Sequence, residues 1–287
     1  MNRWKIPELS ARYKLEPSLR DVFVEGRTDR SFFQWYLLKS GFTDVKVVLI
    51  DSVEIPSETL RDLGLTSGNK QRLIALASEF NRSLGGTAFQ PTCIVDADED
   101  RILSKTISIP QLLWTDYSCV EAYLFNEGHF SKFYHMVLRL DAVDSNLLIS
   151  YGKILSELFL IRAALRECAI PAAWITFVDC CNRTETLITF DKDAFIKRLL
   201  NASNQLSAET ILHRTIESLR KLLTSDVRHS MNGHDLLELL HWEKRGQARR
   251  MELRSSKAVG AALFGCFEYN TVMNLPLFKT LGVRLSV

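Results

Sequence analysis

Short runs of β-branched and apolar residues alternate with segments of helical periodicity over the first third of the chain. Such alternation is typical of βαβ units, in which parallel strands form a sheet and the helices cover it. The pattern therefore predicts an α/β fold with a parallel sheet flanked by helices. The expected strands lie at 21–25, 45–51, 91–100 and 107–114, and the expected helices at 28–41 and 67–86, with a further helix start at 118–125.

Beyond residue 126 the pattern changes to longer helical segments. We therefore predict two domains, an α/β domain over 1–126 and a mostly α-helical domain over 127–287. No flexible linker separates them, so we expect the two parts to pack together. The second domain is expected to contain helices at 147–168, 208–223 and 233–246, and an isolated strand pair at 172–179 and 186–191.

The composition excludes several classes of protein. The chain has 36 Lys and Arg against 34 Asp and Glu, so its net charge provides no general attraction to nucleic acid or membranes. The six cysteines form no CxxC pair, and no run of 18 apolar residues or export signal is present. P-loop, GxGxxG and GxSxG motifs are also absent. We expect a cytoplasmic protein with reduced thiols and no membrane partner.

Two of the expected strands end in acidic residues. Glu25 follows the apolar run VFV, and Asp96 follows CIV and begins a stretch of four acids within five residues. Ligands of open parallel sheets bind at the carboxyl ends of the strands, so these acids should converge. If the strand continues through residue 98, Asp96 and Asp98 project to the same side.

Clustered carboxylates repel one another, and a hard divalent cation with oxygen ligands relieves that repulsion. Mg²⁺ typically completes its coordination with water and phosphate oxygens, so such a cluster indicates phosphodiester chemistry. We predict a Mg²⁺ site, in which Mn²⁺ can substitute, with Glu25, Asp96 and Asp98 as catalytic and metal-binding residues. Asp100 is a further candidate ligand that could support a second metal. Asp29 has two interpretations, a metal ligand or an acid favoured by the dipole of the following helix.

The motifs VFVEGRTD at 22–29 and CIVDADED at 93–100 together resemble the TOPRIM domain shared by topoisomerases, primases and overcoming-lysogenization-defect (OLD) nucleases. The resemblance covers roughly residues 20–125. It implies Mg²⁺ ligation by Asp96 and Asp98, with Glu25 acting as an acid/base or as a further ligand. The chain has no tyrosine domain of the expected size and too little length for a polymerase or helicase module, so strand passage and priming are not expected.

A narrower resemblance rests on SGNKQRL at 67–73, DYSCVEAYLF at 116–125 and NGHDLLELL at 232–240, in a small chain without an ATPase motif. This combination is similar to stand-alone TOPRIM proteins of bacterial defence loci, in particular the AriB effector family of the PARIS anti-phage system. The resemblance implies an effector that an ABC-type ATPase sensor subunit holds inactive until infection is sensed. It also implies that the released protein forms a homodimer and cuts host RNA, with tRNA as the expected target.

Three further groups of residues each have two interpretations. Lys70 is either a solvated cation or a catalytic contact to a phosphate or carboxylate. Glu121 either forms a capping box with Ser118 or, as the resemblance suggests, is an outer metal ligand. The basic segment 241–257 is either a solvated helix face or a nucleic-acid-binding patch that tracks phosphates. The candidate nucleic-acid contacts in this segment are Lys244, Arg245, Arg249 and Arg250.

The aromatic segment SFFQWYLL at 31–38 is interpreted as core packing, with a partner surface as the alternative. Three alternatives to the RNA nuclease also stay open. The chain could be a DNA endonuclease of the OLD type or a catalytically idle subunit that docks on an ATPase. A receiver-like or Rossmann-like binding module would also gather acids at strand ends, but a receiver needs a strand-end lysine later in the sheet and a shorter chain.

Overall fold

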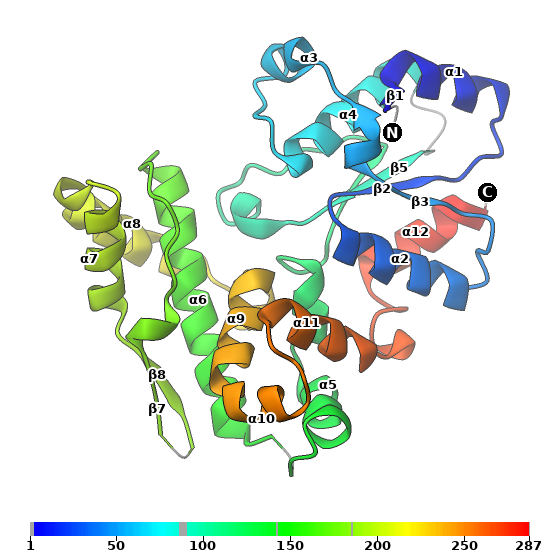
Figure 1. The fold of residues 1–287 in the computed structure, drawn as a ribbon. Helices are drawn as coiled ribbons and strands as arrows, with labels where there is room; N and C mark the ends of the chain where they lie inside the picture. The colour runs from blue at the N-terminus through cyan, green and yellow to red at the C-terminus, as the bar shows by residue number, and fades with distance from the viewer. Residues whose placement is uncertain (1–2, 86–90, 142, 185, 287) are drawn as a thin grey trace. The chain divides into compact units, whose positions relative to one another are not determined.

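The computed structural model describes residues 3–85, 91–141, 143–184 and 186–286, except for the side chains of residues 247 and 249. The chain divides into two compact units (Figure 1). The first unit comprises Met1–Asp96, Ile107–Asp116 and Tyr269–Val287, and the second comprises Ala97–Thr106 and Tyr117–Glu268. This division differs from the predicted boundary at residue 126, because three separate segments build the first unit.

A four-stranded parallel sheet forms the centre of the first unit, which confirms the predicted α/β class. The strand order is β3-β2-β5-β6, so the direction in which the sheet grows reverses between β2 and β5. A separate parallel pair is formed by β1 (Trp4–Lys5) and β4 (Val53–Glu54). The strands of the sheet are β2 (Val22–Val24), β3 (Val47–Leu49), β5 (Thr92–Val95) and β6 (Leu112–Trp114).

Helices cover both faces of this sheet (Figure 1). On one face, α1 (Ile6–Leu15) and α4 (Asn69–Leu84) enclose a core in which Phe80 packs against Tyr13 and Phe23. On the other face lie α2 (Arg27–Lys39) and α12 (Pro276–Ser286). The short helix α3 (Ser57–Asp62) precedes α4.

The aromatic helix α2 is covered by the C-terminal segment of the first unit. The Phe278 ring of α12 lies 6.1 Å from the Phe33 ring and 4.7 Å from the Tyr36 ring, measured between centroids. Phe32, Phe33 and Tyr36 are consequently almost fully buried. The interpretation of these aromatic residues as core packing is therefore confirmed, and the packing explains why residues 269–287 belong to the first unit.

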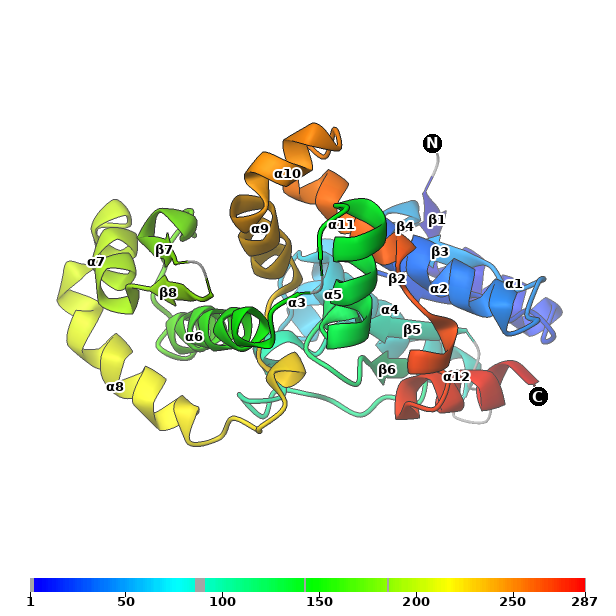
Figure 2. The same ribbon diagram turned by 90° about the horizontal axis from the view of Figure 1, so that it is seen from below.

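The second unit is mostly helical, as expected for the later part of the chain. The long helix α6 (Ser145–Glu167) packs against α8 and α9 (Figure 2). Its Tyr151 and Phe159 side chains are buried. The remaining elements are α5 (Glu127–Lys132), α7 (Lys192–Ala202), α8 (Glu209–Arg220), α9 (Gly233–Glu243), α10 (Arg245–Arg250), α11 (Ser256–Gly265) and the antiparallel pair β7 (Cys181–Arg183) and β8 (Ile188–Phe190).

Two predicted elements differ from the structure. The prediction of a strand at 172–179 is wrong. A 3₁₀ turn occupies Val178–Cys180, and the pairing of β7 with β8 begins only at Cys181. The helix expected from 118 is a 3₁₀ helix, η3 (Val120–Leu124). Among the described residues, none of the helices combines the length and apolar character that crossing a membrane requires.

Candidate functional site

The reversal of strand order between β2 and β5 is the topological switch point of the sheet. Ligands of open α/β sheets bind outside the carboxyl ends of the strands at such a point. Glu25 directly follows β2, and Asp96 directly follows β5. The Asp96 backbone N–H donates a hydrogen bond to Glu25 Oε1 at 3.1 Å. The structure therefore brings these two predicted site residues into contact.

The beginning of α4 lies at the same edge of the sheet. Asn69, its first residue, donates a hydrogen bond from Nδ2 to the Glu25 carbonyl oxygen at 3.1 Å. The Lys70 ammonium lies 5.7 Å from the centroid of the Trp114 ring, at the end of β6. Lys70 is thus placed among the strand ends, as its predicted catalytic role requires. Sequence reasoning missed Asn69, although its position beside Lys70 at a helix start was the available signal.

Gly26 and Asp29 form a local cap at the start of α2. Gly26 is the N-cap residue, and its N–H donates to Asp29 Oδ2 at 2.8 Å. A carboxylate in the first helical turn is stabilised by the helix dipole and by this backbone hydrogen bond. The structure therefore supports the interpretation of Asp29 as a residue that caps the start of α2.

Asp98 does not continue the strand that precedes it. β5 ends at Val95, and Asp98 has a φ of +40° at the start of the 3₁₀ helix η2 (Asp98–Asp100). Aspartate is one of the few residues with a side chain that tolerates this left-handed region. The strand therefore does not continue through residue 98, which was the condition for alternation to direct Asp96 and Asp98 to one side. Chain connectivity alone keeps their Cα atoms within about 7 Å of each other.

Asp100 has a cationic partner in the second unit. Its side chain is buried, and Oδ1 lies 2.5 Å from Arg166 Nη2. Glu99 is 3.7 Å from the other terminal nitrogen of the same guanidinium. A buried charge needs a paired and hydrogen-bonded partner, and Arg166 supplies one here. The predicted role of Asp100 in supporting a second metal would require the ion to share this carboxylate with Arg166.

Ser118 connects the acidic turn to a distant segment of the second unit. Its carbonyl oxygen accepts a hydrogen bond from the Asp98 N–H at 2.7 Å, and its own N–H donates to the Arg228 carbonyl at 3.0 Å. Its hydroxyl donates to the Met231 carbonyl at 2.6 Å. The predicted capping box between Ser118 and Glu121 is wrong, because the N-cap of η3 is Cys119 and Ser118 bonds elsewhere.

The carboxyl group of Glu121 packs against Gly233, the first residue of α9. A Cβ atom at Gly233 would lie 2.1 Å from Glu121 Oε2, so the glycine makes room for the carboxyl group. Burial raises the pKa of Glu121 above its ordinary value of 4.5, and Asp98 raises it further, whereas His234 lowers it. Asp98, Glu121 and His234 are thus electrostatically coupled within the second unit.

This raised pKa predicts a pH-dependent cost of folding. Burial favours the protonated acid, so the cost is absent below pH 4.5 and grows as the pH rises above that value. We expect Glu121→Gln to increase the free energy of unfolding in EDTA more at pH 7 than at pH 4, by about 1.4 kcal/mol for each unit of pKa shift. Urea denaturation at the two pH values measures the difference. An equal effect of the substitution at both values would contradict the assignment.

The predicted nucleic-acid patch on 241–257 is only partly exposed. Lys244 is 5% exposed, with its ammonium 3.0 Å from Glu243 Oε1 and 4.5 Å from the centroid of the Tyr134 ring. Its predicted contact with phosphates is therefore wrong, because α9 ends at Glu243 and directs the next side chain inward. Arg245 and Arg250 are exposed, whereas Arg249 lies in α10 with a side chain outside the described part of the structure.

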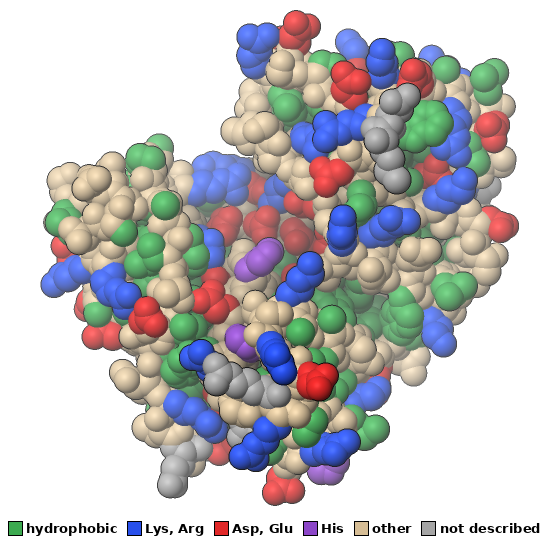
Figure 3. Space-filling model, viewed as in Figure 1, with side chains coloured by type: hydrophobic (Ala, Val, Ile, Leu, Met, Phe, Trp, Pro, Cys, Tyr) green, Lys and Arg blue, Asp and Glu red, His purple; other side chains and the backbone are tan. Residues whose placement is uncertain are grey.

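Lysine and arginine side chains are spread over both units on the face drawn in Figure 3. This distribution agrees with the near balance of 36 basic and 34 acidic residues. The net charge therefore provides little long-range attraction for a nucleic acid. Any contact with phosphates must come from particular side chains close to the acidic residues.

A metal ion at the switch point would need oxygen ligands from the side chains there. Within the described residues, no three His, Cys, Asp or Glu side chains form a ready-made metal site. Mg²⁺ in phosphate-handling enzymes is usually held by one or two carboxylates, and water and substrate phosphates complete its shell. Glu25 and Asp96 supply two carboxylates at adjacent strand ends. These residues therefore fit Mg²⁺ or Mn²⁺ bound together with a phosphate substrate.

The fold and these residues define the first unit as an open parallel α/β sheet with acidic residues at its switch point. Comparison with known proteins adds no family assignment. A scan against protein-family models found no match for this chain, and a search of curated proteins found no significantly similar sequence.

Proposed function

We propose that this protein is a Mg²⁺-dependent nuclease that cleaves phosphodiester bonds in RNA, with host tRNA as the expected substrate. The contact between Glu25 and Asp96 at the switch point is the observation on which the proposal rests. The motifs that resemble TOPRIM effectors of anti-phage systems support the narrower role. In that role an ABC-type ATPase sensor holds the protein inactive in the cytoplasm, and the released protein acts as a homodimer.

In the proposed reaction, the residues at the switch point of the first unit have separate roles. Glu25 and Asp96 would hold the metal ion, whereas Asp98, the third ligand predicted from the sequence, belongs to the second unit. When bound, the ion would align the phosphate and stabilise the negative charge that develops on it. The Asp96 N–H orients the Glu25 carboxylate, and the Asn69 amide holds the Glu25 backbone. Lys70 supplies a cation for a phosphate oxygen.

A receiver-like binding module is the second candidate. The order β3-β2-β5-β6 corresponds to the first four strands of the flavodoxin-like arrangement, with acids after its first and third strands. In the described residues, however, the sheet has no strand beyond β6 that could carry the expected strand-end lysine. Phosphorylation of an aspartate by acetyl phosphate would favour this candidate over the nuclease.

Incubation of the purified full chain with tRNA and with plasmid DNA tests the proposal. We expect tRNA to be cleaved in Mg²⁺ or Mn²⁺ and to stay intact in EDTA, because metal ligation is required for the reaction. Preferential cleavage of the plasmid would instead support the OLD-type DNA endonuclease. If both substrates stay intact in Mg²⁺ and Mn²⁺, the chain is an idle docking subunit or a binding module, and the nuclease proposal is wrong.

A further inference from the structure

A cavity of about 470 Å³ lies in the second unit, between α6 and the segment that follows α8. Cavities of roughly 300–1,000 Å³ are typical binding sites for small molecules. Its lining residues on α6 recur at helical spacing and form one face of the helix; they are Leu148, Ile149, Gly152, Lys153, Ser156 and Glu157. Nine residue steps along an α-helix span about 14 Å. The cavity is therefore an elongated groove along α6.

The apolar part of the lining comes from α6, from Phe125 at the end of η3, and from Val227 of the 3₁₀ helix η7 (Val227–His229). A Cβ atom at Gly152 would lie 3.4 Å from Val227 Cγ2, so the glycine lets Val227 pack directly on α6. Among the lining residues that the structure describes, Ile149 is the one large apolar side chain that is exposed, at 55%. The apolar surface is thus confined to the groove, and it lacks the wide exposed patch that marks a protein interface.

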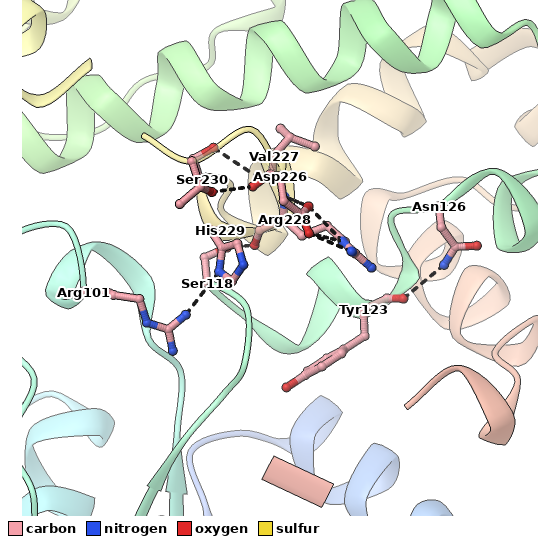
Figure 4. Close-up of polar contacts among 10 residues, drawn as sticks. Arg101, Ser118, Tyr123, Asn126, Asp226, Val227, Arg228, His229 and Ser230 are labelled. Carbon is pink, nitrogen blue, oxygen red and sulfur yellow. Dashed lines mark hydrogen bonds and ion pairs between the residues drawn. The ribbon is translucent and has the colours of Figure 1, made fainter. Parts of the chain in front are cut away.

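Contacts within the protein hold the walls of the groove in position. The Asp226 carboxylate accepts hydrogen bonds from the backbone N–H and the guanidinium of Arg228 (Figure 4). The Ser230 hydroxyl donates to the Val227 carbonyl at 3.2 Å, and it lies 2.9 Å from the Ser156 hydroxyl of α6. The turn that carries Val227 is therefore tied to the helix. A site whose walls are already ordered binds its ligand at a lower entropic cost.

The polar side chains around the groove leave one positive charge unbalanced. Arg220 Nη2 lies 2.7 Å from Glu157 Oε2, so these two charges neutralise each other. Glu217, which also contacts Arg220, is 3.7 Å from Lys192. Lys153 is exposed and forms no ion pair with any residue that the structure describes. An anionic group in the groove can therefore pair with Lys153.

We propose that this groove binds a small free carboxylate with an apolar body, such as a medium-chain fatty acid. The apolar body lies against Phe125, Leu148 and Val227, and the carboxylate pairs with Lys153. This inference is independent of the proposed nuclease function, because every lining residue belongs to the segment Tyr117–Glu268 of the second unit.

Isothermal titration calorimetry of the full chain with octanoate tests the proposal. Hexanoate has a shorter apolar body, and 1-octanol has the same length without the charge. We expect hexanoate to bind about tenfold more weakly than octanoate, because two buried methylene groups are lost. Lys153→Gln should raise the Kd of octanoate about threefold, the size of one exposed ion pair, and should leave the Kd of 1-octanol unchanged. Ser225→Trp should weaken both ligands, because Ser225 lines the groove and an indole there takes up its volume.

Lys197→Gln is the matched control, because Lys197 is an exposed lysine of α7 outside the groove. It should leave every Kd unchanged, and thermal melting should show that all variants are folded. The proposal is wrong if octanoate does not bind, or if Ser225→Trp binds octanoate as tightly as Lys197→Gln does. An unchanged Kd for octanoate in Lys153→Gln would overturn the assignment of a carboxylate ligand. Binding to phosphatidylglycerol vesicles without binding of octanoate would assign the groove to a lipid surface and would also overturn the proposal.

Discussion

Glu25→Gln is expected to lower the kcat/KM of RNA cleavage by about 10²–10³-fold and to leave the fold intact. The glutamine keeps an oxygen that can accept the hydrogen bond from the Asp96 N–H, so the two strand ends stay joined. The substitution removes the negative charge that a divalent ion needs. Asp96→Asn should have an effect of similar size for the same reason. Single-turnover cleavage in Mg²⁺, together with thermal melting, measures both properties.

The exposed Glu54 of β4 provides the matched control for this prediction. Glu54→Gln removes one carboxylate from the same unit and should cleave RNA at the wild-type rate. The Glu25 variant should also need more Mg²⁺ for its residual activity. Wild-type cleavage by Glu25→Gln would show that the switch point is not the catalytic centre.

A fragment of residues 1–126 is expected not to fold into a stable domain, although the sequence pattern marks it as one. It lacks α12, whose Leu277, Phe278, Leu281 and Leu285 are at most 7% exposed. Burial of each such side chain contributes about 1.5–3 kcal/mol, so their combined loss is comparable to the usual net stability of a domain. Circular dichroism with urea denaturation should show no cooperative transition.

The control joins residues 1–116 to residues 269–287 through a Gly-Ser linker. This chain restores the packing of α12 on α2 without the bulk of the second unit, and it should unfold cooperatively. If the fragment 1–126 unfolds with the same midpoint as the linked chain, α12 contributes little to the first unit.

The sheet and its acidic edge could be predicted because both depend on local patterns. The alternation of apolar runs and helical segments locates the strands, and it predicts parallel pairing because helices lie between β2 and β3 and between β3 and β5. Glu25 and Asp96 then meet because any two neighbouring parallel strands present their carboxyl ends at one edge. Strand order determines which acids become neighbours, and the sequence pattern contains no signal for it.

The features that sequence reasoning missed depend on contacts between distant segments. Nothing local indicates that Phe278 packs on α2, or that Ser118 bonds to the segment after α8. Lys244 belongs to a basic segment whose exposed and buried members look alike in the sequence. The strand ends at Val95, Ala97 already has αR backbone angles, and Asp98 has a left-handed φ, so the alternation does not extend to residue 98. Each miss reflects tertiary packing that overrides a local preference.

Residues 269–287 belong to the first unit although they follow the second unit in the sequence, and this order affects folding during synthesis. The strands of the sheet emerge from the ribosome early, but α12 emerges only after the whole second unit has been translated. N-terminal domains often fold while synthesis continues. Here the nascent chain cannot complete its first unit in that way. The proposed nuclease would therefore gain its active form only after the second unit and α12 had left the exit tunnel.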